Sequence, residues 1–281
     1  MKVAVTGASG FIGRHVLAEL EARSVETIAL ARLASAKTMA HSSSRVVQLD
    51  LHDAPSNAFE LMGRPDVLIH LAWSGLPNYK SLHHFEQELP AQYRFLKGLV
   101  ESGLQNIVVA GTCFEYGMQS GTLSEDVAPH PINPYGFAKD ALRCQLEYLK
   151  SAHPFLLTWA RLFYLYGEGQ AESSLLPQLR QAVERGDPVF NMSGGEQLRD
   201  YLPVTEVARA LVSLALAKKD TGAINICSGT PISVRKLVED LIKENGWSIT
   251  LNLGHYPYPD YEPMAFWGDS GKLSTFIGKA T

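Results

Sequence analysis

The chain has 281 residues, of which 46% are hydrophobic and 19% are charged, and its formal net charge is −4. This composition indicates a globular protein with a buried core and excludes the basic surface of a nucleic-acid-binding protein. No apolar run is long enough for a membrane helix, the chain opens on a strand pattern without a signal peptide, and its three cysteines are too scattered for a disulfide framework or a zinc site. We therefore expect a cytoplasmic protein without a metal site.

The first two-thirds of the chain alternate short β-branched apolar runs with amphipathic helical patterns. Strands are expected at Val3–Thr6, Thr27–Ala31, Val46–Leu49, Val67–Leu71, Ile107–Ala110 and Phe155–Arg161. Helices are expected at Ile12–Ala22, Phe85–Ser102 and Pro134–Ala152, and Pro90 is expected to mark a break or a start within the second of these. This alternation predicts an α/β fold with a doubly wound parallel (Rossmann-type) sheet covered by helices on both faces.

The pattern loosens beyond about residue 166. The expected elements are helices at Leu175–Arg185, Val204–Ala217 and Val234–Asn245, a strand at Ala223–Ile226 and an irregular tail at Leu253–Trp267. No clear linker separates the two parts. We therefore expect a first domain over residues 1–165, with 200–222 packing back on it, and a smaller, interwoven α/β lobe over 166–281.

Three glycines directly follow the first strand and open the first helix. Gly7, Gly10 and Gly13 have the spacing G-x-x-G-x-x-G. Glycines let the backbone turn tightly and approach a pyrophosphate, which then lies at the positive end of the helix. Although G-x-G-x-x-G is the commoner fingerprint, the strand–loop–helix context predicts dinucleotide binding rather than an ordinary turn.

The end of the second strand bears on the choice of cofactor. This strand ends in Arg32, and no carboxylate follows until Asp50. In such folds an acidic residue binds the ribose hydroxyls of NAD, whereas an arginine accommodates the 2′-phosphate of NADP. NADP(H) is the expected cofactor, with NAD(H) as the alternative, because Arg32 can also be an ordinary solvated side chain. Asp50 and Leu51 are placed to meet the adenine, although an aspartate here can equally form a turn.

Tyr135 and Lys139 lie four residues apart at the start of an expected helix. Asn133 is a good N-cap and Pro134 a good first helical residue, so the phenol and the ammonium fall on one face, one turn apart. A nearby cation favours the ionised phenol, and we expect it to bring the Tyr135 pKa closer to neutrality. Taken alone, the spacing fits an ordinary amphipathic helix equally well.

Six ordered motifs resemble the extended short-chain dehydrogenases/reductases, especially their nucleotide-sugar enzymes. These motifs are Thr6–Gly13 (TGASGFIG), His70–Trp73 (HLAW), Gly111–Gly117 (GTCFEYG), Asn133–Lys139 (NPYGFAK), Arg161–Gly167 (RLFYLYG) and Arg199–Val204 (RDYLPV). The resemblance covers nearly the whole chain. It implies that the first domain binds the dinucleotide and that the smaller lobe binds the substrate.

The resemblance implies a catalytic triad of Thr112, Tyr135 and Lys139. In that family the Ser or Thr hydrogen-bonds the substrate oxygen, the Tyr exchanges a proton with it, and the Lys binds the nicotinamide ribose and lowers the Tyr pKa. The implied cofactor contacts are Gly7, Gly10, Phe11, Ile12, Gly13, Arg32, Asp50, Leu51, Leu71, Ala72, Tyr135 and Lys139. The implied substrate contacts are Trp73, Thr112, Phe114, Tyr135, Tyr164 and Arg199, of which Arg199 would clamp a diphosphate.

Departures from the family pattern disfavour a dehydration reaction and a substrate pocket like that of the common epimerases. Dehydratases of the family carry an Asp-Glu pair directly after the catalytic Thr as extra acid and base, whereas this chain has Cys113 and Phe114. Glu115 comes one residue later and, on an extended stretch, would point away from Phe114. Tyr164 and Pro203 replace an Asn and a His that are common in the family, which favours a pocket unlike that of the usual epimerases.

The leading hypothesis is an NADPH-dependent reduction of a keto group, at C4, of a nucleotide-activated deoxysugar, with the proton supplied by Tyr135. An NAD-dependent nucleotide-sugar epimerase is the nearest alternative, and a non-catalytic NADP-sensing protein is a second. The resemblance also implies a homodimer through helices that include Phe85–Ser102 and Pro134–Ala152. The sugar, the nucleotide and the product stereochemistry stay open.

Overall fold

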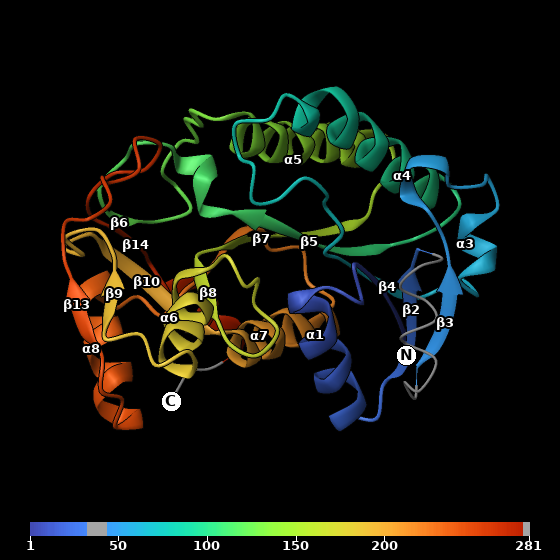
Figure 1. Cartoon of the computed structure of the whole chain (residues 1–281). Helices are drawn as coiled ribbons and strands as arrows, with labels where there is room; N and C mark the ends of the chain where they lie inside the picture. Colours follow the sequence, from blue (N-terminus) through green and yellow to red (C-terminus); the bar gives the residue numbers. More distant parts are fainter. Residues whose placement is uncertain (33–43, 278–281) are drawn as a thin grey trace.

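The computed structural model describes residues 1–32 and 44–277. Its main feature is a seven-stranded parallel sheet with the order β3-β2-β1-β4-β5-β7-β11 (Figure 1). The strands are β1 (Lys2–Thr6), β2 (Glu26–Ala31), β3 (Arg45–Gln48), β4 (Val67–His70), β5 (Asn106–Thr112), β7 (Leu156–Leu162) and β11 (Gly222–Ile226). The predicted doubly wound sheet is confirmed. Because the strand order reverses between β1 and β4, a crevice opens at the carboxyl ends of these two strands.

Helices cover both faces of this sheet. One face carries α1 (Phe11–Ala22), α7 (Val204–Ala217) and α9 (Gly271–Ile277). The other carries α3 (Ala58–Leu61), α4 (Leu89–Glu101) and α5 (Pro134–Ala152). Figure 1 shows α4 and α5 above the sheet and α1 and α7 below it.

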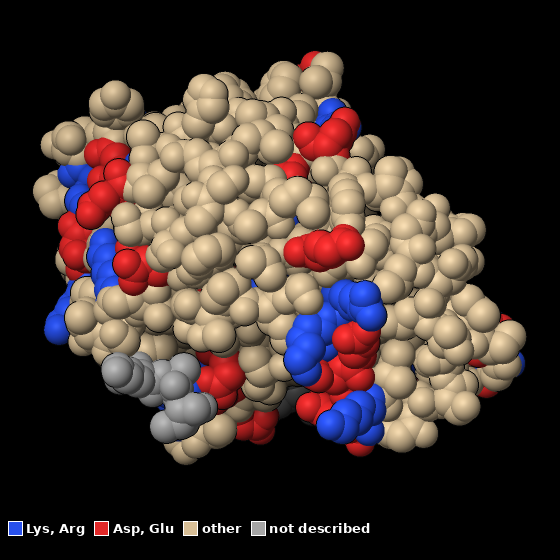
Figure 2. Space-filling view, turned by 90° about the vertical axis from the view of Figure 1, so that its left-hand side faces the viewer, with Lys and Arg blue, Asp and Glu red and all other residues tan. Residues whose placement is uncertain are grey.

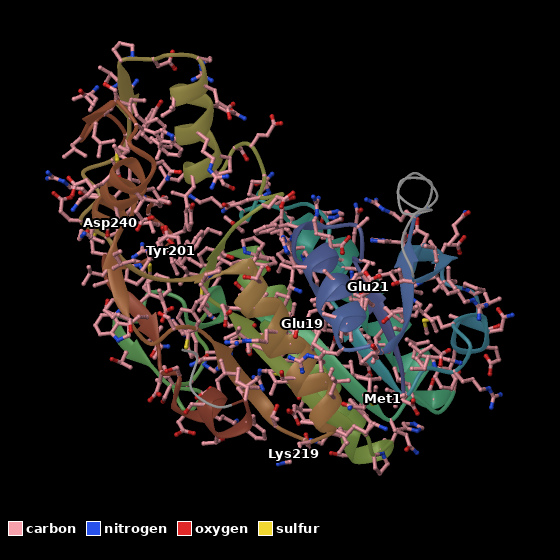
Figure 3. The ribbon with its side chains drawn as sticks, turned by 90° about the horizontal axis from the view of Figure 1, so that it is seen from below. Met1, Glu19, Glu21, Tyr201, Lys219 and Asp240 are labelled. Atoms are coloured by element: carbon pink, nitrogen blue, oxygen red, sulfur yellow. The ribbon has the colours of Figure 1, made fainter. Side chains whose placement is uncertain are left out.

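Apolar stripes on these helices form two buried clusters. Leu20 of α1 and Leu211 of α7 are fully buried in one cluster, whereas Leu96 of α4 and Leu146 of α5 are fully buried in the other. Full burial of such a side chain contributes about 1.5–3 kcal/mol. Seen from below, α1 and α7 lie side by side under the sheet, and the smaller lobe projects at one end (Figure 3).

The smaller lobe consists of short strands and two helices around a core of its own. Its elements are β8 (Tyr164–Tyr166), β9 (Val189–Asn191), β10 (Leu198–Pro203), β12 (Pro231–Ser233), β13 (Thr250–Asn252), α6 (Leu175–Glu184) and α8 (Val234–Asn245). β10 pairs with β8 and β12, and β9 pairs with β13. Leu179 of α6 and Val238 of α8 are fully buried between these elements.

The two parts of the chain are interwoven. β6 (Gly121–Leu123) leaves the first part and pairs with β14 (Phe266–Gly268) near the end of the chain. After β10 the chain returns to the main sheet, where α7 packs on α1 and β11 becomes an edge strand beside β7. A strand therefore ends the segment Leu253–Trp267, for which only an irregular tail is expected.

The expected helix over Phe85–Ser102 is divided near Pro90, where a break or a start is expected. α4 begins at Leu89 and follows a π-helical turn, η2, at His84–Glu88. Pro90 occupies the first turn of α4, where its missing N–H costs no hydrogen bond. The turn directs His84 and Glu88 into the interior, where both are buried.

Charged side chains of both signs are interspersed on the face of the smaller lobe (Figure 2). On α8, Arg235 pairs with Glu239 and Lys236 pairs with Asp240. Such exposed pairs contribute little to stability. Because positive and negative side chains are mixed, the described residues of this surface form no large patch of a single charge. Within the described ranges, the helices are too short or too polar to cross a membrane.

Candidate active site

Most of the sequence-predicted cofactor residues come together at the switch point between β1 and β4, whereas Tyr135 and Lys139 are on α5 and do not line the cleft found there. One cleft of about 420 Å³ is lined there by Gly7, Gly10, Phe11, Ile12, Gly13, Arg32, Asp50, Leu51, Leu71 and Ala72. Trp73, expected to contact substrate, also lines this cleft. The fold therefore collects residues from four separate loops at one edge of the sheet.

The glycine loop has the shape that a phosphate cradle requires. Gly7 has a φ of +65°, and a Cβ there would come within 2.9 Å of the Ala72 nitrogen. A Cβ on Gly13 would come within 2.1 Å of the Gly7 carbonyl oxygen, so α1 can approach the loop only without a side chain. The first turn of α1 has neither a side-chain cap nor an acidic residue. Its N–H groups and positive end therefore fit the pyrophosphate of a dinucleotide.

The end of the cleft next to β2 and β3 carries groups of both signs. Arg32 is exposed at the end of β2. The Asp50 carboxylate lines the cleft but also accepts a hydrogen bond of 3.0 Å from the His52 backbone N–H, capping a short 3₁₀ turn over Leu51–Asp53. Asp50 thus has the turn-forming role that its sequence position left open.

Tyr135 and Lys139 occupy the buried face of α5. The Asn133 side chain caps this helix by accepting a 2.8 Å hydrogen bond from the Gly136 N–H. The Lys139 Nζ donates to the Ala110 carbonyl oxygen at 2.9 Å and lies 6.0 Å from the Tyr135 ring centroid. The two side chains are 8% and 3% exposed, respectively, so both are largely removed from water.

Burial dominates the ionisation of this pair. It lowers the pKa of Lys139 to about 7, because a buried ammonium loses its hydration. It also raises the pKa of Tyr135 above its ordinary value, and a hydrogen bond with Thr112 opposes this rise only in part. The expected lowering of the Tyr135 pKa by Lys139 is therefore wrong for this structure. A phenol that stays protonated at neutral pH is suited to donate a proton.

Thr112 stands at the carboxyl end of β5, next to Tyr135. Its Oγ1 accepts a 3.3 Å hydrogen bond from the Phe114 N–H and begins a 3₁₀ turn, η3, over Cys113–Tyr116. Cys113 is buried, and this burial raises its thiol pKa, so it is a poor nucleophile.

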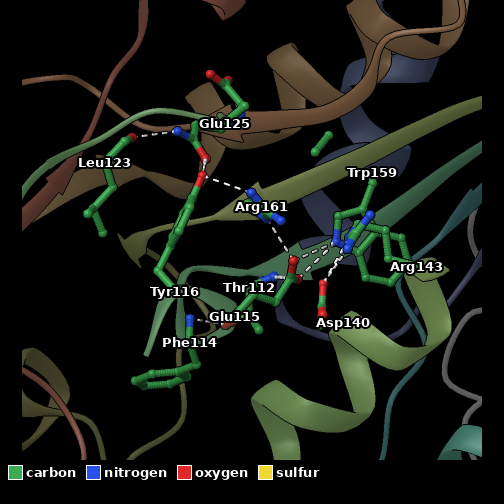
Figure 4. Close-up of polar contacts among 12 residues, drawn as sticks. Thr112, Phe114, Glu115, Tyr116, Leu123, Glu125, Asp140, Arg143, Trp159 and Arg161 are labelled. Atoms are coloured by element: carbon green, nitrogen blue, oxygen red, sulfur yellow. Dashed lines mark hydrogen bonds and ion pairs between the residues drawn. The ribbon is translucent and has the colours of Figure 1, made fainter. Parts of the chain in front are cut away.

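Glu115 is fully buried and is turned toward Trp159 and Arg161 (Figure 4). Its carboxylate accepts hydrogen bonds from the Thr112 N–H at 2.8 Å, the Trp159 indole at 2.9 Å and the Arg161 Nε at 2.7 Å. Arg161 also donates to the Tyr116 hydroxyl at 3.0 Å. Because these bonds occupy the Glu115 oxygens, this carboxylate supports the turn after Thr112 instead of serving as an extra acid or base.

Aromatic rings enclose Tyr135. Its ring centroid lies 5.2 Å from that of His84, 5.6 Å from Tyr79, 6.0 Å from Trp73 and 6.3 Å from Phe114. Tyr261, from the smaller lobe, packs against Tyr79 and Phe114. Sequence analysis does not place Tyr79 or His84 at the site, because the segments that carry them have no hydrophobic period.

Arg199 and Tyr164 line a second cavity, of about 270 Å³, in the smaller lobe. Arg199 is only 2% exposed, and its Nη1 donates to the carbonyl oxygens of Leu198 and Met264. Its Nη2 lies 3.1 Å from Glu262 Oε1, and the Tyr164 hydroxyl donates to the other Glu262 oxygen. The expected diphosphate clamp is thus engaged by an internal carboxylate that sequence analysis did not single out.

A buried polar chain lies behind the cofactor cleft. The Thr6 hydroxyl contacts His70 Nδ1 at 2.9 Å, His70 Nε2 contacts the Gln92 side-chain oxygen at 2.8 Å, and the Gln92 amide donates to Glu88 at 2.8 Å. Burial lowers the pKa of His70 to about 3, so this ring is neutral. Thr6 Oγ1 also accepts the Leu71 N–H at 3.1 Å, so the chain supports the cleft wall.

Comparisons with known proteins identify the family. The model of the NAD dependent epimerase/dehydratase family matches residues 3–227. The chain is 30% identical to dTDP-6-deoxy-L-talose 4-dehydrogenase (NAD(+)) of Aggregatibacter actinomycetemcomitans, over 95% of this chain and 99% of that one. It is 28% identical to dTDP-6-deoxy-L-talose 4-dehydrogenase (NAD(P)(+)) of Kitasatospora kifunensis, over 92% and 83%.

Among solved structures, MoeE5 in complex with UDP-glucuronic acid and NAD superposes with a TM-score of 0.83, at 26% identity, over 100% of this chain and 94% of that one. The fold, the glycine cradle and these similarities agree with one another. The chain belongs to the NAD dependent epimerase/dehydratase family and is an NAD(P)-dependent enzyme of the extended short-chain dehydrogenase/reductase type.

Proposed function

We propose that the protein catalyses the NADPH-dependent reduction of the C4 keto group of a nucleotide-activated 6-deoxysugar. The observation that carries this proposal is the meeting of Tyr135, Lys139 and Thr112 at the end of β5, beside a cleft shaped for a dinucleotide. The names of the two compared relatives supply the sugar class and the position C4.

The reaction follows from the side chains at the end of β5. A nicotinamide coenzyme in the cleft would supply the hydride, which forms the new C–H bond at the carbonyl carbon. Tyr135 transfers its phenolic proton to the carbonyl oxygen as the C=O π bond breaks. Thr112 hydrogen-bonds that oxygen, and a protonated Lys139 stabilises the phenolate until a solvent proton restores Tyr135.

The aromatic enclosure supports a deoxysugar. The rings of Tyr79, Phe114 and Tyr261 present apolar faces next to Tyr135, which suit a methyl group at C6. A carboxylate at C6 would be desolvated against these rings, which is costly without a cation partner. Uronic acids are therefore expected to be poor substrates.

NADPH as the preferred cofactor is supported by Arg32. Its side chain is exposed at the end of β2, where the 2′-phosphate of NADP would lie. The compared relatives are named for NAD(+) and for NAD(P)(+), so either nicotinamide is compatible with this family. The proposal also includes a cytoplasmic location, because NADPH is kept reduced in the cytoplasm.

The test is loss of nicotinamide absorbance with a panel of dTDP-, UDP- and GDP-linked 4-keto-6-deoxysugars. Turnover is expected with at least one of them, with NADPH favoured over NADH about tenfold in kcat/KM, and Arg32→Ala should remove that preference. Tyr135→Phe should lower kcat by a factor of about 10³ or more, whereas Tyr148→Phe, on the exposed side of the same helix, should match the parent. Absence of turnover across the panel would refute the proposal.

An NAD-dependent epimerase is the second candidate, because the matched family is named for epimerases and the same triad would serve it. Such an enzyme interconverts sugars without net consumption of nicotinamide. Tightly retained NAD together with C4 inversion of an alcohol substrate would favour it. A cofactor-sensing protein would instead show cofactor binding that is indifferent to Tyr135→Phe.

A further inference from the structure

The indole ring of Trp73 lies directly on the Lys139 ammonium, with Nζ 4.0 Å from the ring centroid. We propose that Trp73 is a positioning residue whose ring holds Lys139 in its charged form beside Tyr135, and that His84 fixes the ring there. The consequence for turnover rests on the proposed function, whereas the physical interaction does not.

Lys139 needs such a partner because its surroundings are poor in compensating groups. Among the contacts of the described residues, Nζ makes one hydrogen bond, to the Ala110 carbonyl oxygen, and its side chain is 3% exposed. Burial lowers the pKa of Lys139 to about 7, although the charges of Glu115 and Glu88 oppose this fall. The negative face of an indole attracts a desolvated ammonium and favours its protonated form.

The charged and titratable groups around Lys139 come from several elements. Glu115 follows β5, Glu88 precedes α4, His70 ends β4, His84 begins η2, and Tyr135 is on α5 itself.

The two carboxylates among these groups are already engaged by other donors. Glu115 accepts from Arg161 and Trp159, and Glu88 accepts from Gln92 at 2.8 Å. Because these donors already stabilise the two carboxylates, Glu115 and Glu88 attract the Lys139 ammonium less strongly. Besides the Ala110 carbonyl oxygen, the indole of Trp73 is therefore the partner close to Nζ among the described residues.

His84 holds the Trp73 ring in its place. The Trp73 Nε1 donates to His84 Nδ1 at 3.1 Å, and His84 Nε2 lies 2.8 Å from the Asn78 carbonyl oxygen. Because a carbonyl only accepts, the His84 proton is on Nε2 and Nδ1 is free to accept from the indole. Burial lowers the pKa of His84, in agreement with a neutral ring. His84 is fully buried against Tyr135, so the three rings support one another.

A direct titration of Lys139 tests the interaction without any substrate. Protein labelled with ¹³C-lysine would be followed by NMR from about pH 5 to about pH 10, and the Lys139 Cε signal assigned by its absence from Lys139→Met. Trp73→Leu is expected to move the Lys139 titration about one unit to lower pH, and Trp73→Phe, which keeps a π face, only a few tenths. Trp247→Leu, in the smaller lobe, should leave the titration unchanged.

Three results of this titration would overturn the proposal. The first is a Lys139 titration that does not shift in Trp73→Leu. The other two are a shift in Trp73→Phe, or in Trp247→Leu, that is as large as the shift in Trp73→Leu. His84→Phe, which removes the acceptor for the indole N–H, should shift the titration in the same direction as Trp73→Leu. No shift in that variant would remove His84 from the proposed unit.

The pH profile of kcat provides the catalytic readout. If protonated Lys139 is needed for turnover, the alkaline limb of the profile should move about one unit to lower pH in Trp73→Leu. A merely structural defect would scale the whole profile without moving this limb, and that result would contradict the catalytic part of the inference. If no sugar is reduced, the proposed function fails, while the NMR titration still decides the inference.

Discussion

At the scale of single residues, the site shows how burial overrides sequence proximity. Lys139 is one helical turn from Tyr135, and proximity alone predicts a lowered phenol pKa. Both side chains are nearly excluded from water, and this loss of hydration disfavours the charged form of each. The result is a Tyr135 phenol that stays protonated at neutral pH.

The depressed pKa of Lys139 has a consequence for stability. In the unfolded chain the pKa of this lysine is near 10.5, whereas in the folded chain it is about 7. Between these values the unfolded chain binds a proton that the folded chain does not, so the free energy of unfolding rises with pH. From pH 7 to about pH 8.5 the parent should gain up to about 1.4 kcal/mol per unit more than Lys139→Met. Urea denaturation across this range checks the prediction, and parallel curves for the two proteins would contradict it.

Glu115 illustrates a buried charge with a structural role. Glu115→Gln should lower the free energy of unfolding by about 3–5 kcal/mol, because it leaves the Arg161 guanidinium buried without its counter-ion. The matched control is Glu239→Gln, which breaks the exposed pair with Arg235 and should cost less than about 1 kcal/mol. Equal midpoints for the two variants in urea denaturation would show that the buried Arg161 does not need Glu115 as its counter-ion.

At the scale of elements, close packing of α5 against the turn after β5 sets the site geometry. A Cβ on Gly136 would come within 2.6 Å of the Phe114 carbonyl oxygen. Gly136→Ala should therefore push α5 away from η3, destabilise the protein by about 1–3 kcal/mol and reduce kcat, because Tyr135 and Thr112 move apart.

Gly98, in the interior of α4, offers a matched control for this substitution. A Cβ added there meets nothing within 4 Å. Gly98→Ala should stabilise the protein by about 0.5–1 kcal/mol through helix propensity and leave kcat unchanged. Thermal unfolding and steady-state kinetics on both variants check the pair, and a harmless Gly136→Ala would contradict the packing argument.

At the scale of the whole molecule, α5 exposes large apolar side chains on its outer side. Phe137 is 53% exposed and Tyr148 is 80% exposed, and they lie about three turns apart on one face. Phe137 also packs edge-on against Phe85 of the segment before α4. We predict that this face forms the homodimer contact implied by the family resemblance.

Sedimentation tests the predicted dimer. The parent should sediment as a dimer, and Phe137→Glu combined with Tyr148→Glu should shift it to a monomer, because charges would be buried in the contact. Leu61→Glu, at the end of α3, is the control and should leave the mass unchanged. A monomeric parent would show the prediction to be wrong.

The sheet and the glycine cradle at its edge could be predicted because they depend on local patterns. The glycine spacing after β1, the N-cap Asn133 and the four-residue interval from Tyr135 to Lys139 are all readable within a few residues. Patterns of this kind act through backbone geometry, which is the same wherever the segment lies in the fold.

The remaining features of the site depend on contacts between distant segments. His84 reaches Trp73 only because of a π-helical turn, and Glu262 meets Arg199 only because the tail folds over the smaller lobe. The pKa values of Tyr135 and Lys139 depend on how much water these segments exclude. The sequence by itself determined the fold class through short-range periodicity and the cofactor cleft through its glycine spacing, whereas the catalytic roles of Thr112, Tyr135 and Lys139 are what the family resemblance implies and stay predictions. Only the tertiary structure decided their protonation and their aromatic enclosure, because desolvation and ring packing are sums over neighbours that are remote in the chain.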